Sequence, residues 1–121
     1  MPIQPLADDT PDGWPAVLQA TPLLLLFKHS PLCGASGVSH DRVTDFADAH
    51  PDLPIFLIDV IAQRELSGRI AAALGVGHES PQVILIRDGQ PVWNRSHFRI
   101  TRDALETAVA RARTAGRPPP A

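Results

Sequence analysis

The sequence predicts an α/β fold in which a four-stranded mixed sheet is flanked by helices. Three observations support this prediction. Apolar runs of strand length alternate with longer segments whose apolar residues recur at helical spacing. The last two runs are separated by an Asp-Gly pair, which is typical of a tight turn between antiparallel strands. A chain of 121 residues has room for one hydrophobic core, so we expect one domain.

The first half of the predicted domain contains a strand, a helix and a second strand. Residues 23–28 begin with a continuous apolar run, which is typical of a central strand covered on both faces. This strand ends before Pro31, because proline lacks a backbone donor for the sheet. Residues 34–49 have apolar side chains along one helix face, and residues 55–58 form the second buried strand. A shorter helix over residues 14–20 precedes the first strand.

The second half contains a helix, a hairpin and a last helix. Residues 66–74 have a leucine or isoleucine at every fourth position, and Gly75 follows as a left-handed cap. Residues 83–86 and 91–94 are the two strands of the hairpin. The last helix begins at Thr101 as its N-cap. The order β-α-β-α-β-β-α, leaving aside the short first helix, is that of the thioredoxin fold.

Both ends of the chain are expected to lie outside the folded domain. Residues 1–13 contain three prolines and a glycine, which disfavour regular structure, so we predict a mobile lead-in. A run of three prolines predicts that residues 116–121 are a disordered tail. The thioredoxin-like domain is therefore expected over residues 14–115.

Composition and charge argue against several classes of protein. No apolar run exceeds five residues, whereas a membrane-spanning helix needs roughly 20, so we expect no membrane segment. The N-terminus lacks the basic and apolar parts of a secretory signal, which predicts a cytoplasmic protein. A net charge of −2 with scattered arginines predicts no nucleic-acid partner. The five histidines lack the spacing of a metal site, so none is predicted.

Cys33 is the only cysteine, and it lies at the predicted junction between the first strand and the next helix. A helix N-terminus stabilises a thiolate and lowers the pKa of a cysteine below its free value of about 8.5. Ser36 could donate its hydroxyl to the sulfur, while Lys28 and His29 bring positive charge nearby. We therefore predict a reactive single thiol that needs a partner's sulfur to form a disulfide. The alternative is an inert, buried cysteine.

Pro81 precedes a buried strand, at the position where a thioredoxin fold carries a cis-proline opposite the redox centre. We therefore predict a cis peptide bond before Pro81. Such a bond would expose the backbone N–H and C=O of Ser80 beside Cys33, where an incoming chain can pair as a short strand. His78 and His97 could approach the same site.

Short segments around this site also carry a family resemblance. They are Lys28-His29-Ser30, Ile58 to Ile61, Gln63 to Ser67 and His78 to Gln82, and they continue at Gly89, Val92-Trp93 and Ser96 to Thr101. In combination they resemble the YtxJ-type monothiol bacilliredoxins of the bacillithiol redox system. The similarity extends from about Trp14 to Ala112.

The resemblance implies a monothiol disulfide oxidoreductase that removes bacillithiol from S-bacillithiolated proteins. Bacillithiol is a low-molecular-weight thiol that stands in for glutathione, and here it would be the reducing co-substrate with no bound cofactor. The Cys33 thiolate would attack the bacillithiol sulfur of a mixed disulfide, and a second bacillithiol would then free Cys33. By position, Lys28, His29, Ser80 and His97 are the candidates to contact the sugar and carboxylates of bacillithiol.

Two departures qualify the resemblance. The family pattern is Cys-Pro-Ile-Ser, whereas Gly34 and Ala35 follow the cysteine here, so a proline suited to the first helical turn is missing. Phe27 stands where many thioredoxins bury an acid that serves a resolving cysteine, and the second cysteine is replaced by Ser36. The alternative function is a thioredoxin-fold binding module that carries a bacillithiol-modified or iron–sulfur-ligating cysteine without turnover. The sequence does not indicate whether the protein is a monomer or an oligomer.

Overall fold

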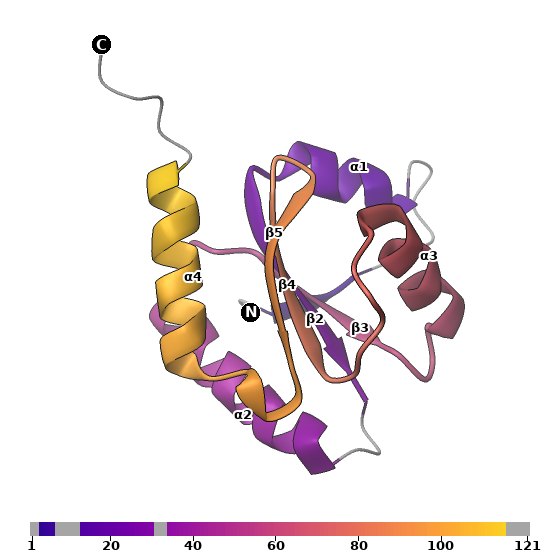
Figure 1. Ribbon diagram of the computed structural model, residues 1–121, viewed down its shortest axis with the longest axis horizontal. Helices are drawn as coiled ribbons and strands as arrows, with labels where there is room; N and C mark the ends of the chain where they lie inside the picture. Colours follow the sequence, from indigo (N-terminus) through magenta and orange to yellow (C-terminus); the bar gives the residue numbers. More distant parts are fainter. Residues whose placement is uncertain (1–2, 7–12, 31–33, 116–121) are drawn as a thin grey trace.

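Five strands form one mixed sheet in the part of the chain that the computed structural model describes, residues 3–6, 13–30 and 34–115 (Figure 1). They are β1 (Ile3–Pro5), β2 (Leu23–His29), β3 (Ile55–Asp59), β4 (Gln82–Arg87) and β5 (Gln90–Ser96), in the spatial order β1-β3-β2-β4-β5. β3 runs parallel to both of its neighbours, and β4 runs antiparallel to both of its own. The predicted thioredoxin-like α/β fold is confirmed, with one strand more than predicted.

The extra strand is β1, at the outer edge of β3. Its register pairs Ile3 with Ile55, and beyond it the backbone N–H of Leu6 donates to the carbonyl of Leu57 at 2.9 Å. Leu6 is buried beside α1 and α3. The expectation that the first residues form no regular element was therefore wrong for residues 3–5, because their order comes from pairing with a distant strand.

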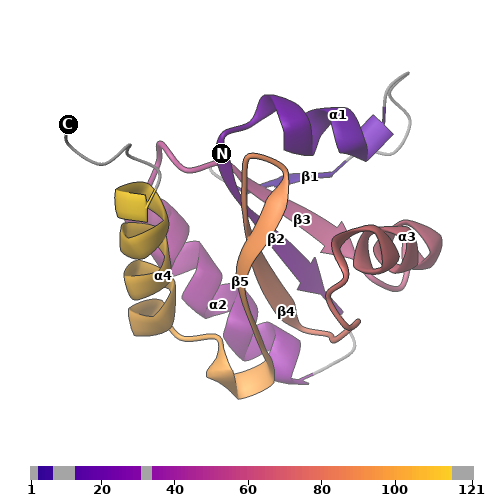
Figure 2. The ribbon, with the colours of Figure 1, turned by 45° about the horizontal axis from the view of Figure 1, so that its top comes forward.

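Helices cover both faces of the sheet (Figures 1 and 2). The helices are α1 (Gly13–Ala20), α2 (Gly34–Ala49), α3 (Arg64–Leu74) and α4 (Arg102–Ala115), and a short 3₁₀ turn, η1 (His97–Arg99), precedes α4. α2 and α4 pack on one face, and α1 and α3 pack on the other. The predicted caps are confirmed: Gly75 is left-handed with φ 68°, and the Thr101 hydroxyl accepts the Ala104 N–H at 3.2 Å.

Strand β2 lies at the centre of the core, as its continuous apolar run predicted. Leu25 and Phe27 point towards α2 and α4, while Leu24 and Leu26 point towards α1 and α3. All four side chains are fully buried. This alternation follows from the strand period of two residues and explains the continuous run of apolar side chains from Leu24 to Phe27.

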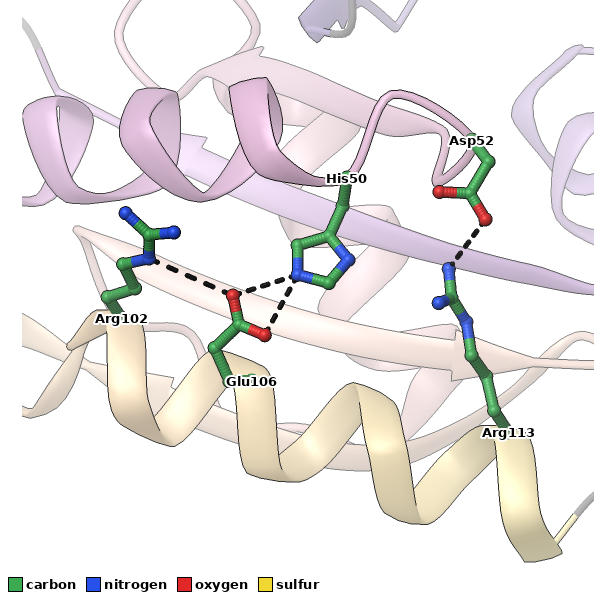
Figure 3. Close-up of polar contacts among 5 residues, drawn as sticks. All are labelled: His50, Asp52, Arg102, Glu106 and Arg113. Carbon is green, nitrogen blue, oxygen red and sulfur yellow. Dashed lines mark hydrogen bonds and ion pairs between the residues drawn. The ribbon is translucent and has the colours of Figure 1, made fainter.

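Polar contacts join α4 to the chain that follows α2 (Figure 3). The His50 imidazole Nε2 lies 2.8 Å from a carboxylate oxygen of Glu106, and Arg102 lies 3.8 Å from the same oxygen. Near the end of α4, Arg113 contacts Asp52 at 3.1 Å. The His50–Glu106 and Arg113–Asp52 contacts thus connect α4 to the segment that follows α2. None of the described helices is long and apolar enough to cross a membrane.

The hairpin between β4 and β5 turns at Asp88 and Gly89, which both have positive φ, at 52° and 79°. This is the tight Asp-Gly turn predicted from the sequence. A Cβ atom at Gly89 would lie 2.8 Å from the Gln19 amide nitrogen, so the turn packs closely on α1. Each edge strand of the sheet contains a proline, Pro5 in β1 and Pro91 in β5.

Candidate functional site

The predicted reactive thiol lies in the short connection between β2 and α2. β2 ends at His29 and α2 begins at Gly34, which confirms the strand-to-helix junction. Cys33 itself lies outside the described residues. Ser36 belongs to the first turn of α2, but its side chain also lies outside the described part of the structure. Ser30 and Gly34 are the described residues nearest to Cys33 in the chain.

Pro81 lies beside the end of β2. Lys28 of β2 pairs with Gln82, the residue after Pro81, and the Ser80–Pro81 peptide bond is cis, as predicted. The carbonyl of Pro81 accepts the backbone N–H of His97 at 3.0 Å. The hydroxyl oxygen of Ser80 is buried and has no hydrogen-bond partner among the described residues.

His97 approaches Pro81 through its backbone, and its side chain is exposed. It is left-handed with φ 54°, and its carbonyl accepts the hydroxyl of Ser39 at 3.4 Å, which links η1 to α2. The imidazole Nδ1 lies 3.9 Å from a carboxylate oxygen of Glu79. The structure thus brings His97 next to Pro81, with its ring directed to an acidic neighbour.

Lys28 is fully buried on the α3 face of the sheet. Its ammonium Nζ donates to the carbonyl of Ser67 at 3.4 Å and lies 3.3 Å from Nδ1 of His78. The Ser67 hydroxyl also lies 3.3 Å from this Nδ1. Burial lowers the pKa of Lys28. Lys28 contacts His78, and His78 is the residue that lies closer to the site.

His29 points to the opposite face, towards α2. Its ring centroid lies 5.7 Å from that of Phe27 and 5.1 Å from that of His40. Burial, and then the nearby His40, lower the pKa of His29, whereas Asp59 opposes the shift. The lowered pKa keeps the ring neutral at neutral pH. Its Nδ1 atom is buried and has no partner among the described residues.

A groove of about 530 Å³ lies between the end of β2, the start of α3 and the segment before Pro81. Its lining residues are Ser30, Val60, Ile61, Arg64, Gly68, His78 and Ser80. Sequence reasoning missed Arg64, which is the first residue of the helix after β3. The general rule that ligands bind outside the carboxyl ends of parallel strands could have indicated it.

A comparison with protein families shows the family of the chain. A family model described as monothiol bacilliredoxin BrxC matches residues 9–105. The chain belongs to this family. The resemblance seen in the sequence is thereby confirmed.

Solved structures agree on the fold. A thioredoxin-fold protein proposed to be an oxidoreductase is 30% identical, with a TM-score of 0.76, and the match covers 88% of this chain and 92% of that one. A mutant thioredoxin from Halobacterium salinarum is 23% identical, with a TM-score of 0.68 and 90% of each chain covered. The thioredoxin of Malassezia sympodialis is 16% identical, with a TM-score of 0.69, and covers 91% of this chain and 90% of its own.

The bacilliredoxin family and the thioredoxin fold together support a thiol redox role for the protein. The structure sorts the predicted site residues into two groups. Ser80, Pro81 and His97 lie together at the start of β4 and the end of β5. Lys28 and His29 lie at the end of β2 but on opposite faces of the sheet. Only the face that carries Lys28 adjoins the groove, through His78.

Proposed function

We propose that the protein is a monothiol disulfide oxidoreductase that removes bacillithiol from protein mixed disulfides through Cys33. The observation that carries this proposal is a single cysteine at a strand-to-helix junction, in a chain of the monothiol bacilliredoxin family. A lone thiol cannot resolve its own mixed disulfide, so a small-molecule thiol must supply the second sulfur.

The proposed cycle has two exchanges. In the first, the Cys33 thiolate attacks the bacillithiol sulfur of the mixed disulfide, and the target protein's sulfur leaves as a thiolate. In the second, a bacillithiol thiolate attacks the bacillithiol sulfur now bound to Cys33. Bacillithiol disulfide leaves, and the Cys33 thiolate is restored. Each step forms one S–S bond and breaks one, so no further oxidant or reductant is needed.

The start of α2 supports the thiolate form of Cys33. α2 is 16 residues long and begins directly after the cysteine, and it has no acidic side chain in its first turn. Partial positive charge at a helix N-terminus stabilises an adjacent anion, and the effect is confined to the first turn. Cys33 is thus expected to have a pKa below that of a free thiol.

A fluorescence assay on a bacillithiol-capped protein tests the proposal. The wild type is expected to restore the target's thiol when bacillithiol is supplied, whereas Cys33→Ser is expected to have no activity. Equal release by the two proteins would refute a role for Cys33. Visible absorbance after anaerobic reconstitution, without any release of bacillithiol, would favour the iron–sulfur binding module instead.

Ser36→Cys offers a sharper test of the single-thiol mechanism. A second thiol three positions after Cys33 can attack its mixed disulfide and release bacillithiol. Mass spectrometry after one turnover should then find an internal disulfide in this variant and a bacillithiol adduct in the wild type. An adduct-free wild type would contradict the proposed cycle.

A further inference from the structure

We propose that the groove beside the site is a carboxylate-binding subsite, in which Arg64 pairs with an acidic group of the small thiol that reacts at Cys33. This inference rests on the proposed function and adds to it the chemistry by which the small thiol is recognised. Three sets of observations support it: the place of the groove, its charge, and its free hydrogen-bonding groups.

The groove adjoins described residues that flank the predicted redox site in the sequence. Ser30 and Ser80 both line it. Ser30 directly precedes the connection that contains Cys33, and Ser80 directly precedes Pro81. Its volume of about 530 Å³ falls within the range of small-molecule pockets, roughly 300–1,000 Å³. It therefore suits a small ligand rather than a folded partner.

The lining of the groove is positively charged, although the chain as a whole has a net charge of −2. Arg64 forms no ion pair with another described residue, and no described carboxylate lines the groove. Asp59 accepts the backbone N–H of Ile61 at 2.9 Å, and Glu79 faces His97. An unpaired guanidinium in a concave site is suited to bind a carboxylate through two parallel hydrogen bonds.

His78 offers a hydrogen-bond donor in the same groove. An ammonium group can only donate, so the contact from Lys28 makes Nδ1 of His78 the acceptor and puts the ring proton on Nε2. Burial, Lys28 and Arg64 all lower the pKa of His78, while Glu79 raises it, so the net shift keeps the ring neutral at neutral pH. Lys28 is thus a positioning residue, because it acts by fixing which nitrogen of His78 donates.

Ser80 supplies the third group. Ser80 is one of the residues that line the groove. Its hydroxyl oxygen is buried and has no hydrogen-bond partner among the described residues. A buried hydroxyl without a partner is costly unless a ligand or water satisfies it. One full positive charge with two neutral donors matches a carboxylate, and Val60 and Ile61 give the remaining wall an apolar surface.

Two chromogenic disulfides test the subsite without bacillithiol. Dithiobis(nitrobenzoate) carries a carboxylate on each ring, whereas dithiodipyridine is uncharged at neutral pH. With either reagent the Cys33 thiolate forms a mixed disulfide and one aromatic thiolate leaves. Because the chain has one cysteine, the released chromophore reports on Cys33 alone.

Arg64→Gln is expected to lower the rate constant for the carboxylate reagent about tenfold, the size expected for one lost charge-assisted contact. The rate constant for the neutral reagent should change by less than about twofold. The decrease in the rate constant for the carboxylate reagent should become smaller at high salt. Arg64→Lys should retain part of the selectivity. Arg111→Gln, on the exposed side of α4, is the matched control and should leave both rate constants unchanged.

Equal loss with the two reagents would mean that Arg64 acts on the thiol itself, and an equal effect of Arg111→Gln would mean a general charge effect. Either result would overturn the subsite, as would unchanged rates in Arg64→Gln. If charge selectivity is found but bacillithiol is not removed from proteins, the subsite stands and the proposed function is wrong. If bacillithiol is removed without charge selectivity, only the subsite is wrong.

Discussion

The two faces of the sheet differ most at the end of β2. On the α2 face the strand ends in aromatic packing, where Phe27, His29 and His40 lie within about 6 Å of one another, ring to ring. On the α3 face it ends in a buried ammonium, Lys28, held by Ser67 and His78. One strand therefore directs packed aromatic rings to one side and a positive charge to the other.

This difference separates stability from function. The α2 and α4 face contains the larger apolar cluster, including Phe46, which stacks on His50 with centroids 4.4 Å apart. The α3 face buries a charged group, which costs free energy, and that charge acts on the groove beside the site. We expect substitutions on the first face to change stability alone, and those on the second to change reactivity as well.

The largest expected effect is on the apolar face. Phe46→Ala should lower the free energy of unfolding by about 3–5 kcal/mol, because it removes a fully buried ring from the α2 and α4 cluster. Phe98→Ala is the control, since this ring is 64% exposed, and it should change stability by less than about 0.5 kcal/mol. Chemical denaturation measures both. Similar losses in the two variants would contradict the assignment of the core.

Lys28→Met is expected to raise the free energy of unfolding, an effect of intermediate size and of opposite sign to that of Phe46→Ala. The pKa of Lys28 is lowered in the folded protein, so folding disfavours its charged form. This cost is fully present below the folded-state pKa and disappears as the pH rises through the unfolded value of 10.5. Methionine of similar length should therefore stabilise the protein by about 1 kcal/mol at neutral pH, and less at about pH 10.

Denaturation of wild type and Lys28→Met at the two pH values checks this prediction. A stabilisation that grows with pH would reverse the expected sign and contradict it. The same variant should also weaken the preference of Cys33 for the carboxylate reagent, because His78 loses the contact that orients its proton. A merely structural role for Lys28 would leave that preference unchanged.

The smallest effect is expected at the contacts of α4 with the segment that follows α2. Glu106→Gln removes the carboxylate that His50 and Arg102 share, and its side chain is 39% exposed. Surface ion pairs contribute little, so the free energy of unfolding should fall by about 0.5 kcal/mol, and less at high salt. Thermal unfolding at two salt concentrations measures this. A loss above about 2 kcal/mol would show that these contacts contribute more than ordinary surface ion pairs.

The sequence was sufficient to predict most of the fold because its strongest signals are local. The apolar runs of β2, β3 and β4, the spacing of Leu66 and Ile70, and the Asp88-Gly89 turn each determine one element. β1 was not predictable in this way, since its three residues become a strand only by pairing with β3. The order of these locally determined helices and strands was enough to predict the thioredoxin fold.

The site was only partly predictable. The positions of Cys33 and Pro81 follow from element order, which the sequence contains. The burial of Lys28 does not, because a lysine at a strand end is usually exposed, and here α3 covers it. Arg64 and His78 come from separate elements, so only the three-dimensional arrangement shows that they share a groove.

The prolines of the two edge strands have a consequence for how the protein behaves among other chains. An open sheet edge offers a row of unpaired N–H and C=O groups to which another strand can add. Pro5 in β1 and Pro91 in β5 each remove one donor from such a row, and β1 is only three residues long. Both borders of the sheet are thus expected to resist growth into fibres or joined sheets.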